Sequence, residues 1–125
     1  MPNNTQAPDM KEIFADIEKQ VMTLAETTVS NFKDQAVADA KNLVNVFKND
    51  IIRWTNLLST GQITIAEFEF LVGTEKSITK MVALEQAGLA QLRISAFLSG
   101  VLNVVTDVVL KTVVGNETPA PQVVV

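Results

Sequence analysis

The sequence predicts an all-α protein: a long antiparallel helical hairpin, with two arms of about 50 residues each, either straight or kinked, that associates into a four-helix or larger helical bundle. Three observations support this prediction. The 125 residues are 47% hydrophobic and 19% charged, which is typical of one folded domain. Residues 9–60 contain neither glycine nor proline, and their apolar positions recur at helical spacing. Gly61 then separates this stretch from a second one of nearly equal length.

The first predicted arm covers residues 9–60 and follows an N-terminal segment, residues 1–8, that is expected to be disordered. Its apolar residues recur every eleven positions, which corresponds to about 3.67 residues per turn and keeps them on one helix face. Residues 27–31 are the weakest point, because β-branched and short polar residues lower helix propensity there. The two rows are Met10, Val21, Phe32, Leu43 and Trp54, and Phe14, Ala25, Ala36, Phe47 and Leu58.

A tight turn is predicted at residues 59–64. Gly61 can adopt the left-handed conformation that ends a helix. Thr64 and Glu67 have the spacing of a capping box, which starts the next helix. Ile63 and Phe68 occupy the positions of a hydrophobic staple around this cap.

The second predicted arm runs from residue 65 to residue 114, and residues 115–125 are expected to form a flexible tail. The favoured break within this arm is at Gly73 and Thr74. Residues 94–114 contain one acid, Asp107, and one base, Lys111, and are apolar on most sides. Such a helix requires burial on several sides. Burial in a soluble oligomer is favoured over membrane insertion, because Asp107 would cost about 2.5–3.5 kcal/mol in a bilayer.

A lone two-helix rod would expose too much of this apolar surface to water. Self-association of hairpins solves this problem, and breaks near Thr28 and Gly88, which would give a compact monomer, are the alternative. The residues predicted to mediate self-association are Phe14, Val21, Phe32, Leu43, Phe47, Trp54, Phe97, Val101, Leu102, Val105 and Val108.

The composition excludes several chemistries. The chain has no Cys, His or Tyr, which removes thiol and imidazole catalysis and the usual zinc ligands, so no metal or cofactor is expected. A net charge of −4 without a basic cluster argues against nucleic-acid binding. Residues 56–67 resemble a calcium loop only in part, since Leu58 has no oxygen to offer at a ligand position.

Four charged residues are candidates for burial. Asp39 and Asp50 lie eleven residues apart at the margin of the apolar rows. Arg93 has no acid within four positions, so we expect it either to pair with one of them or to lie exposed. Asp107, within the most apolar stretch of the chain, is the fourth.

These observations predict a non-enzymatic structural or interaction protein whose partner is a second copy of itself, with a further protein partner left open. The alternative function is that of a membrane-active, pore-forming-like protein whose C-terminal arm inserts conditionally. A cytoplasmic location is expected, because no basic segment followed by an apolar run begins the chain. Export without such a signal stays open.

Overall fold

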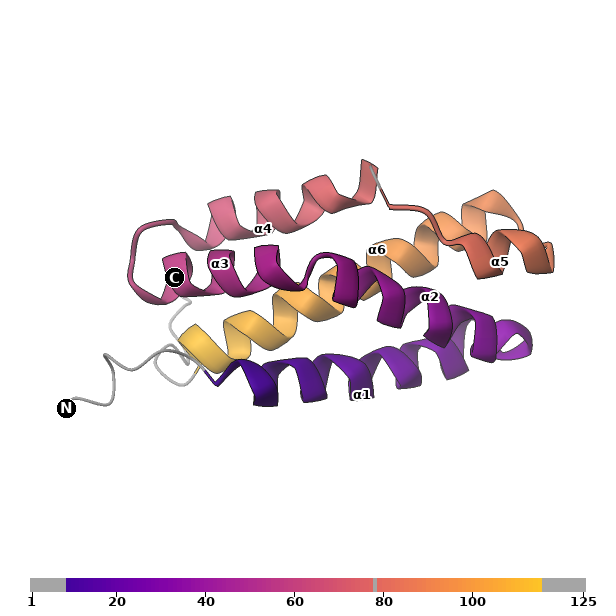
Figure 1. Ribbon diagram of the computed structural model, residues 1–125, viewed down its shortest axis with the longest axis horizontal. Coiled ribbons are helices and arrows are strands. Elements are labelled where there is room, and N and C mark those ends of the chain that lie inside the picture. Colours follow the sequence, from indigo (N-terminus) through magenta and orange to yellow (C-terminus); the bar gives the residue numbers. More distant parts are fainter. Residues whose placement is uncertain (1–8, 78, 116–125) are drawn as a thin grey trace, which may run out of the picture.

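The elements in the part of the chain that the structure describes are all helices or helical turns, and the predicted all-α class is confirmed. The computed structural model describes residues 9–77 and 79–115. The segment 1–8 and residues 116–125, predicted to be disordered and flexible, lie outside the described residues. In chain order the elements are α1 (Met10–Thr28), the 3₁₀ turn η2 (Ser30–Phe32), α2 (Lys33–Val46), α3 (Lys48–Ser59), α4 (Ile65–Thr74), the 3₁₀ turn η3 (Glu75–Ser77), α5 (Val82–Ala87), α6 (Gln91–Leu110) and the π-helical turn η4 (Lys111–Gly115) (Figure 1).

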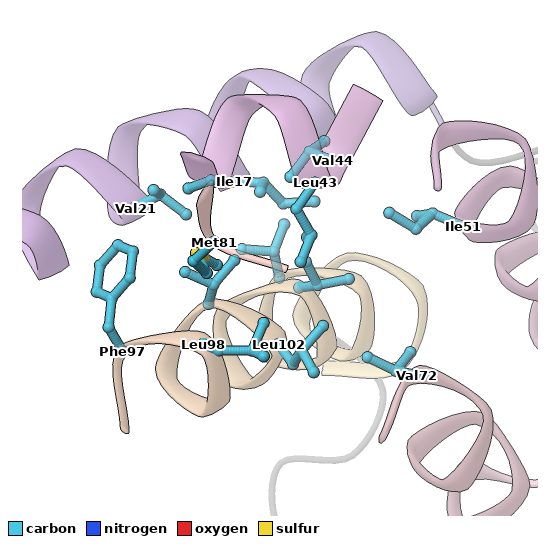
Figure 2. Close-up of a cluster of buried hydrophobic side chains, with 14 of the residues drawn as sticks. Ile17, Val21, Leu43, Val44, Ile51, Val72, Met81, Phe97, Leu98 and Leu102 are labelled. Carbon is cyan, nitrogen blue, oxygen red and sulfur yellow. The ribbon is translucent and has the colours of Figure 1, made fainter. Parts of the chain in front are cut away.

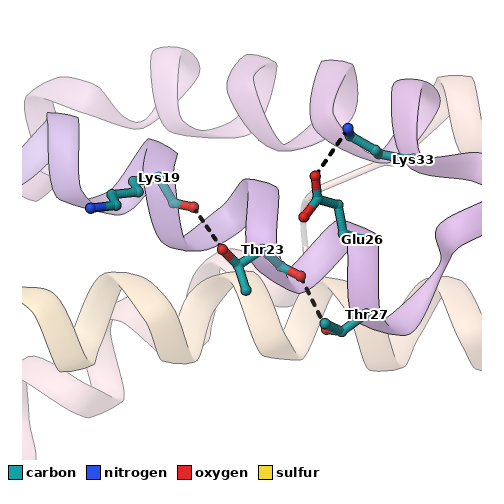
Figure 3. Close-up of polar contacts among 5 residues, drawn as sticks. All are labelled: Lys19, Thr23, Glu26, Thr27 and Lys33. Carbon is teal, nitrogen blue, oxygen red and sulfur yellow. Dashed lines mark hydrogen bonds and ion pairs between the residues drawn. The ribbon is translucent and has the colours of Figure 1, made fainter.

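The first arm is not one helix, so the prediction of 50-residue arms is wrong. Val29 ends α1 with φ −138° and ψ 49°, outside the helical region, and its side chain is buried. The preceding hydroxyl group of Thr27 donates a hydrogen bond of 3.1 Å to the carbonyl oxygen of Thr23 (Figure 3). The hydroxyl group of Thr28 donates one of 2.6 Å to the carbonyl oxygen of Leu24. Such bonds from side chain to backbone compete with a regular helix. The break therefore falls in the stretch with the weakest helix propensity.

The break reverses the chain, so that α2 lies against α1 and runs in the opposite direction (Figure 1). Lys33, at the start of α2, forms an ion pair with Glu26 near the end of α1, with Nζ and Oε2 3.0 Å apart (Figure 3). A second irregularity at Phe47 separates α2 from α3. Backbone hydrogen bonds from Phe47 to Leu43 and from Ile51 to Phe47 span it, so the chain continues in nearly the same direction (Figure 1).

The turn between α3 and α4 forms at residues 60–64. Gly61 has φ +79°, the left-handed conformation that favours glycine. The hydroxyl group of Thr64 accepts a hydrogen bond from the Glu67 amide at 3.0 Å, and the Glu67 carboxylate accepts one from the Thr64 amide at 2.8 Å. Phe68 is fully buried and Ile63 is half-buried beside this capping box. The turn brings α4 back along α3 (Figure 1).

The second arm also breaks. Helix α4 continues through Thr74, and Glu75–Ser77 form a 3₁₀ turn instead of starting a new α-helix. The short helix α5 ends at Gly88, which has φ +93°, and α6 begins three residues later at Gln91. These breaks place α5 against α2.

Helix α6 is covered by other helices of the same chain. It packs against α1, α4, α5 and η3. Gly100 permits the close approach of α6 to α1, because a Cβ atom there would lie 2.9 Å from Cδ2 of Leu24. The polar residues Ser95, Asn103 and Asp107 lie on the exposed side. The buried residues of α6, some of which Figure 2 shows within the core, are Ile94, Phe97, Leu98, Val101, Leu102, Val105, Val108 and Val109.

The breaks in both arms explain why the hairpin prediction fails. In a two-helix rod each arm touches one neighbour, whereas the observed chain reversals place several neighbours around α6. A two-helix rod would leave the apolar residues of 94–114 in need of a second copy for burial. In the observed fold, most of them are buried by helices of the same chain. Burial of apolar surface, at about 25 cal/mol per Å², outweighs the loss of a few helical hydrogen bonds at each break.

Candidate interaction surface

The residues predicted to mediate self-association belong to the core of a single chain. None of them is exposed, and most are buried within one chain, so their role in self-association stays a prediction. Phe14, Phe32 and Phe47 are half-buried and pack against the core from its edge. Val21, Leu43, Trp54, Phe97, Val101, Leu102, Val105 and Val108 are buried.

Asp39 is buried, with 8% of its surface exposed, and its partners are backbone amides. Its two carboxylate oxygens accept hydrogen bonds from the amides of Ala83 and Leu84, at 2.9 and 2.8 Å. These amides are in the first turn of α5, where the N-cap residue Met81 provides no side-chain hydrogen bond. Asp39 on α2 therefore caps a helix that lies 44 residues further along the chain.

Of the two expectations for Arg93, the exposed position is the one observed, and no ion pair joins Arg93 to a carboxylate of the described residues. It is exposed, and its Nη2 atom donates a hydrogen bond of 2.9 Å to the carbonyl oxygen of Thr28, in the last turn of α1. Asp50 instead forms an ion pair of 2.9 Å with Arg53 on its own helix. Asp107 is exposed on α6.

Sequence reasoning missed the exposed side of α4. This helix packs against α3 and α6 through its buried residues Phe68 and Val72. Phe70 points away from them and has 70% of its surface exposed. We define the α4 outer face as Ala66, Phe70, Gly73 and Thr74, which are all exposed and follow the spacing of one helix face.

Two glutamates flank the α4 outer face. Glu67 and Glu69 are both exposed, and Glu67 is also part of the capping box with Thr64. Ile65, 41% exposed, adds apolar surface at the edge. The other large apolar side chains that are exposed in the described residues lie on separate helices: Met22, Val46, Val82 and Leu92.

A groove of about 460 Å³ lies between α1 and α3. The ammonium group of Lys48 is 5.8 Å from the centroid of the Phe14 ring, in the range of a cation–π contact. This lining combines apolar side chains with exposed charges and pairs no nucleophile with a general base. The lining residues are Met10, Lys11, Phe14, Ala15, Glu18, Lys48 and Ile52.

No set of three or more metal-ligating side chains is grouped within residues 9–77 and 79–115. The segment Gln91–Val114 is long and apolar enough to cross a membrane, with a mean hydropathy of 1.7, and 39% of its most apolar window is buried in this fold. No family model, curated protein or solved structure matches this chain.

Proposed function

We propose that the protein is a non-enzymatic interaction module that self-associates, and that two copies meet through the α4 outer face. The observation that carries the proposal is the exposure of Phe70 on a helix whose opposite side is already buried. An aromatic side chain left in water on a helix face offers a large apolar area at low entropic cost.

The residues around Phe70 favour a second copy as the partner. Ala66 lies one turn before Phe70 and Gly73 lies about one turn after it, so small side chains flank the ring on both sides. In an antiparallel pair of α4 helices, the ring of each copy can pack over the small residues of the other. Such a contact is self-complementary, as a two-fold interface must be.

Gly73 supports the close approach of a helix from a second copy to the α4 outer face. It lies within α4, its φ is not positive, and a Cβ atom there would meet nothing within 4 Å among the described residues. Neither backbone conformation nor internal packing therefore requires glycine, which costs about 1 kcal/mol relative to alanine inside a helix. A neighbouring helix that packs on this face would make use of the missing side chain.

The expected interface is small, because one face of a ten-residue helix falls well short of the roughly 800 Å² per partner found in standard interfaces. Self-association should therefore be weak and concentration-dependent. Since Glu67 and Glu69 flank the face in both copies, salt should strengthen the association by screening their repulsion.

Sedimentation velocity over a wide concentration range tests this proposal. The unmodified chain should form dimers as concentration rises, and Phe70→Ser should remain monomeric. The matched control is Leu92→Ser, since Leu92 is 85% exposed on α6 and lies outside the α4 outer face. A chain that stays monomeric at millimolar concentration, or a dimer that survives Phe70→Ser, would refute the proposal.

A second candidate function is conditional membrane insertion by residues 91–114. The observation in its favour is the length and mean hydropathy of this segment. Insertion requires α6 to leave its contacts with α1 and α4, so a trigger that loosens this packing must precede it.

Vesicle leakage tests this candidate with a substitution that spares the fold. Asn103 is exposed near the middle of the segment, so Asn103→Lys should leave stability unchanged while adding about 2.5–3.5 kcal/mol to insertion. Leakage that falls for this variant, but not for Asn49→Lys at an exposed position of α3, supports insertion. Equal leakage from both variants, or none from the unmodified chain under any condition that loosens its fold, argues against it.

A further inference from the structure

Glu75 is a buried acid that the proposed functions do not use. It begins η3, and only 5% of its surface is exposed. Its Oε2 atom is buried and has no hydrogen-bond partner within the part of the chain that the structure describes. A charged carboxylate in this position would leave one oxygen without compensation for its lost hydration.

The acid that acts on Glu75 is Asp50, in the first turn of α3. Its negative charge and a hydrogen bond between the two side chains both raise the pKa of Glu75, and such a bond requires a proton on one of the two carboxyl groups. Asp50 also forms its 2.9 Å ion pair with Arg53, whereas the buried Glu75 carboxyl group has no cationic partner among the described ion pairs, so we assign the proton to Glu75.

Neither of the ion pairs formed by the described residues, Lys33–Glu26 and Arg53–Asp50, includes Glu75. Helix α6 packs against η3, and its residues 94–105 include no charged side chain. In α4 the acids Glu67 and Glu69 are exposed, and Glu67 is bound in the capping box. Lys76 follows Glu75 directly and is exposed to solvent.

We propose that Asp50 and Glu75 form a pH-sensitive contact, in which the Glu75 carboxyl group donates its proton to the Asp50 carboxylate and thereby holds the α4–η3 junction against α3. When the proton leaves for solvent, the negative charge of the buried Glu75 carboxylate lies beside that of Asp50, which is itself half-buried. The contact then changes from attractive to repulsive, and η3 separates from α3. This inference is independent of self-association and of membrane insertion.

The electrostatics of Glu75 place the transition near neutral pH. Burial, the negative charge of Asp50 and the hydrogen bond to Asp50, in that order of size, together raise the pKa of Glu75 to about 7. Because the pKa of Glu75 is higher in the folded state than in the unfolded state, the stability that Glu75 contributes is fully present below about pH 4.5. That stability is lost as pH rises through about 7, which is the reverse of ordinary acid denaturation.

Urea denaturation of the full chain between pH 5 and pH 8 provides the first test. The folding equilibrium constant should fall by about two orders of magnitude for the unmodified chain, and much less for Glu75→Gln, whose amide can still donate to Asp50. The control is Glu69→Gln, the same chemical change at an exposed position of α4, which should retain the full pH dependence. Identical pH profiles for the unmodified chain and Glu75→Gln would overturn the proposal.

Limited trypsin digestion tests the local conformational change. Lys76 is exposed and follows Glu75, so cleavage there reports on opening of η3. At each pH, the cleavage rate of the unmodified chain is divided by the cleavage rate of Glu75→Gln. This ratio should be several-fold higher at pH 8 than at pH 6. A ratio that does not change with pH would show that η3 remains closed when Glu75 loses its proton.

Discussion

At the scale of single residues, several charged side chains act on helix ends within this chain. The Asp39 carboxylate holds the first turn of α5, and the Arg93 guanidinium binds a carbonyl oxygen in the last turn of α1. Each opposes the partial charge of the helix end that it meets. Their spacing along the sequence indicated partial burial for Asp39 but could not show these partners, because each hydrogen bond joins residues far apart in the chain.

The contribution of Asp39 can be measured by substitution. Asp39→Ala removes two hydrogen bonds and leaves the amides of Ala83 and Leu84 without acceptors, so we expect a loss of about 2 kcal/mol in unfolding free energy. Fluorescence of Trp54 during urea denaturation gives this value, since it is the only tryptophan. Asp34→Ala, at an exposed position of the same helix, should change stability by less than about 0.5 kcal/mol. Equal effects of the two substitutions would show that the cap contributes nothing.

At the scale of the elements, local signals located the turn but not every break. The capping box and Gly61 are contained within a few residues, so the α3–α4 turn was predictable. The two eleven-residue apolar rows continue on both sides of the break at Val29, because the residues before and after the break face the same core. An uninterrupted apolar pattern without glycine or proline therefore did not guarantee an uninterrupted helix.

Two glycines should respond to alanine substitution in opposite directions. At both Gly61 and Gly73 a Cβ atom would meet nothing within 4 Å among the described residues, so the two sites differ mainly in backbone conformation. Gly61→Ala should lower the unfolding free energy by about 1 kcal/mol, because its φ is +79°. Gly73→Ala should raise it by up to about 1 kcal/mol, because the residue lies within α4. Denaturation of dilute samples provides both values, and the same sign for both would contradict this reading of the backbone.

At the scale of the whole molecule, α6 is covered by its own chain. Its contacts with α1, α4, α5 and η3 bury the apolar side, and polar residues occupy the other. One chain thus supplies the helices that bury the apolar side of α6, and the proposed self-association through α4 would add to this packing.

Core substitution tests whether this burial is intramolecular. Leu102→Ala should lower the unfolding free energy by about 2–5 kcal/mol, because Leu102 is buried among other apolar side chains (Figure 2). Leu92→Ala, on the exposed side of the same helix, should be nearly neutral. The thermal midpoint of the unmodified chain should not depend on concentration in dilute solution. A midpoint that rises steadily with dilute protein concentration would mean that the core of α6 is completed by another copy.

The sequence by itself determined the all-α class, the turn around Gly61 and some of the residues that form the core, because these depend on periodicity and on hydrogen bonds between near neighbours. The tertiary structure decided where the arms reverse, which helices cover α6, and which partners Asp39 and Glu75 meet. The propensity differences around Val29 amount to tenths of a kcal/mol per residue, whereas burying a single large apolar side chain is worth about 1.5–3 kcal/mol. Contacts between distant segments therefore outweighed the local preference for a continuous helix, and only the folded chain reveals them.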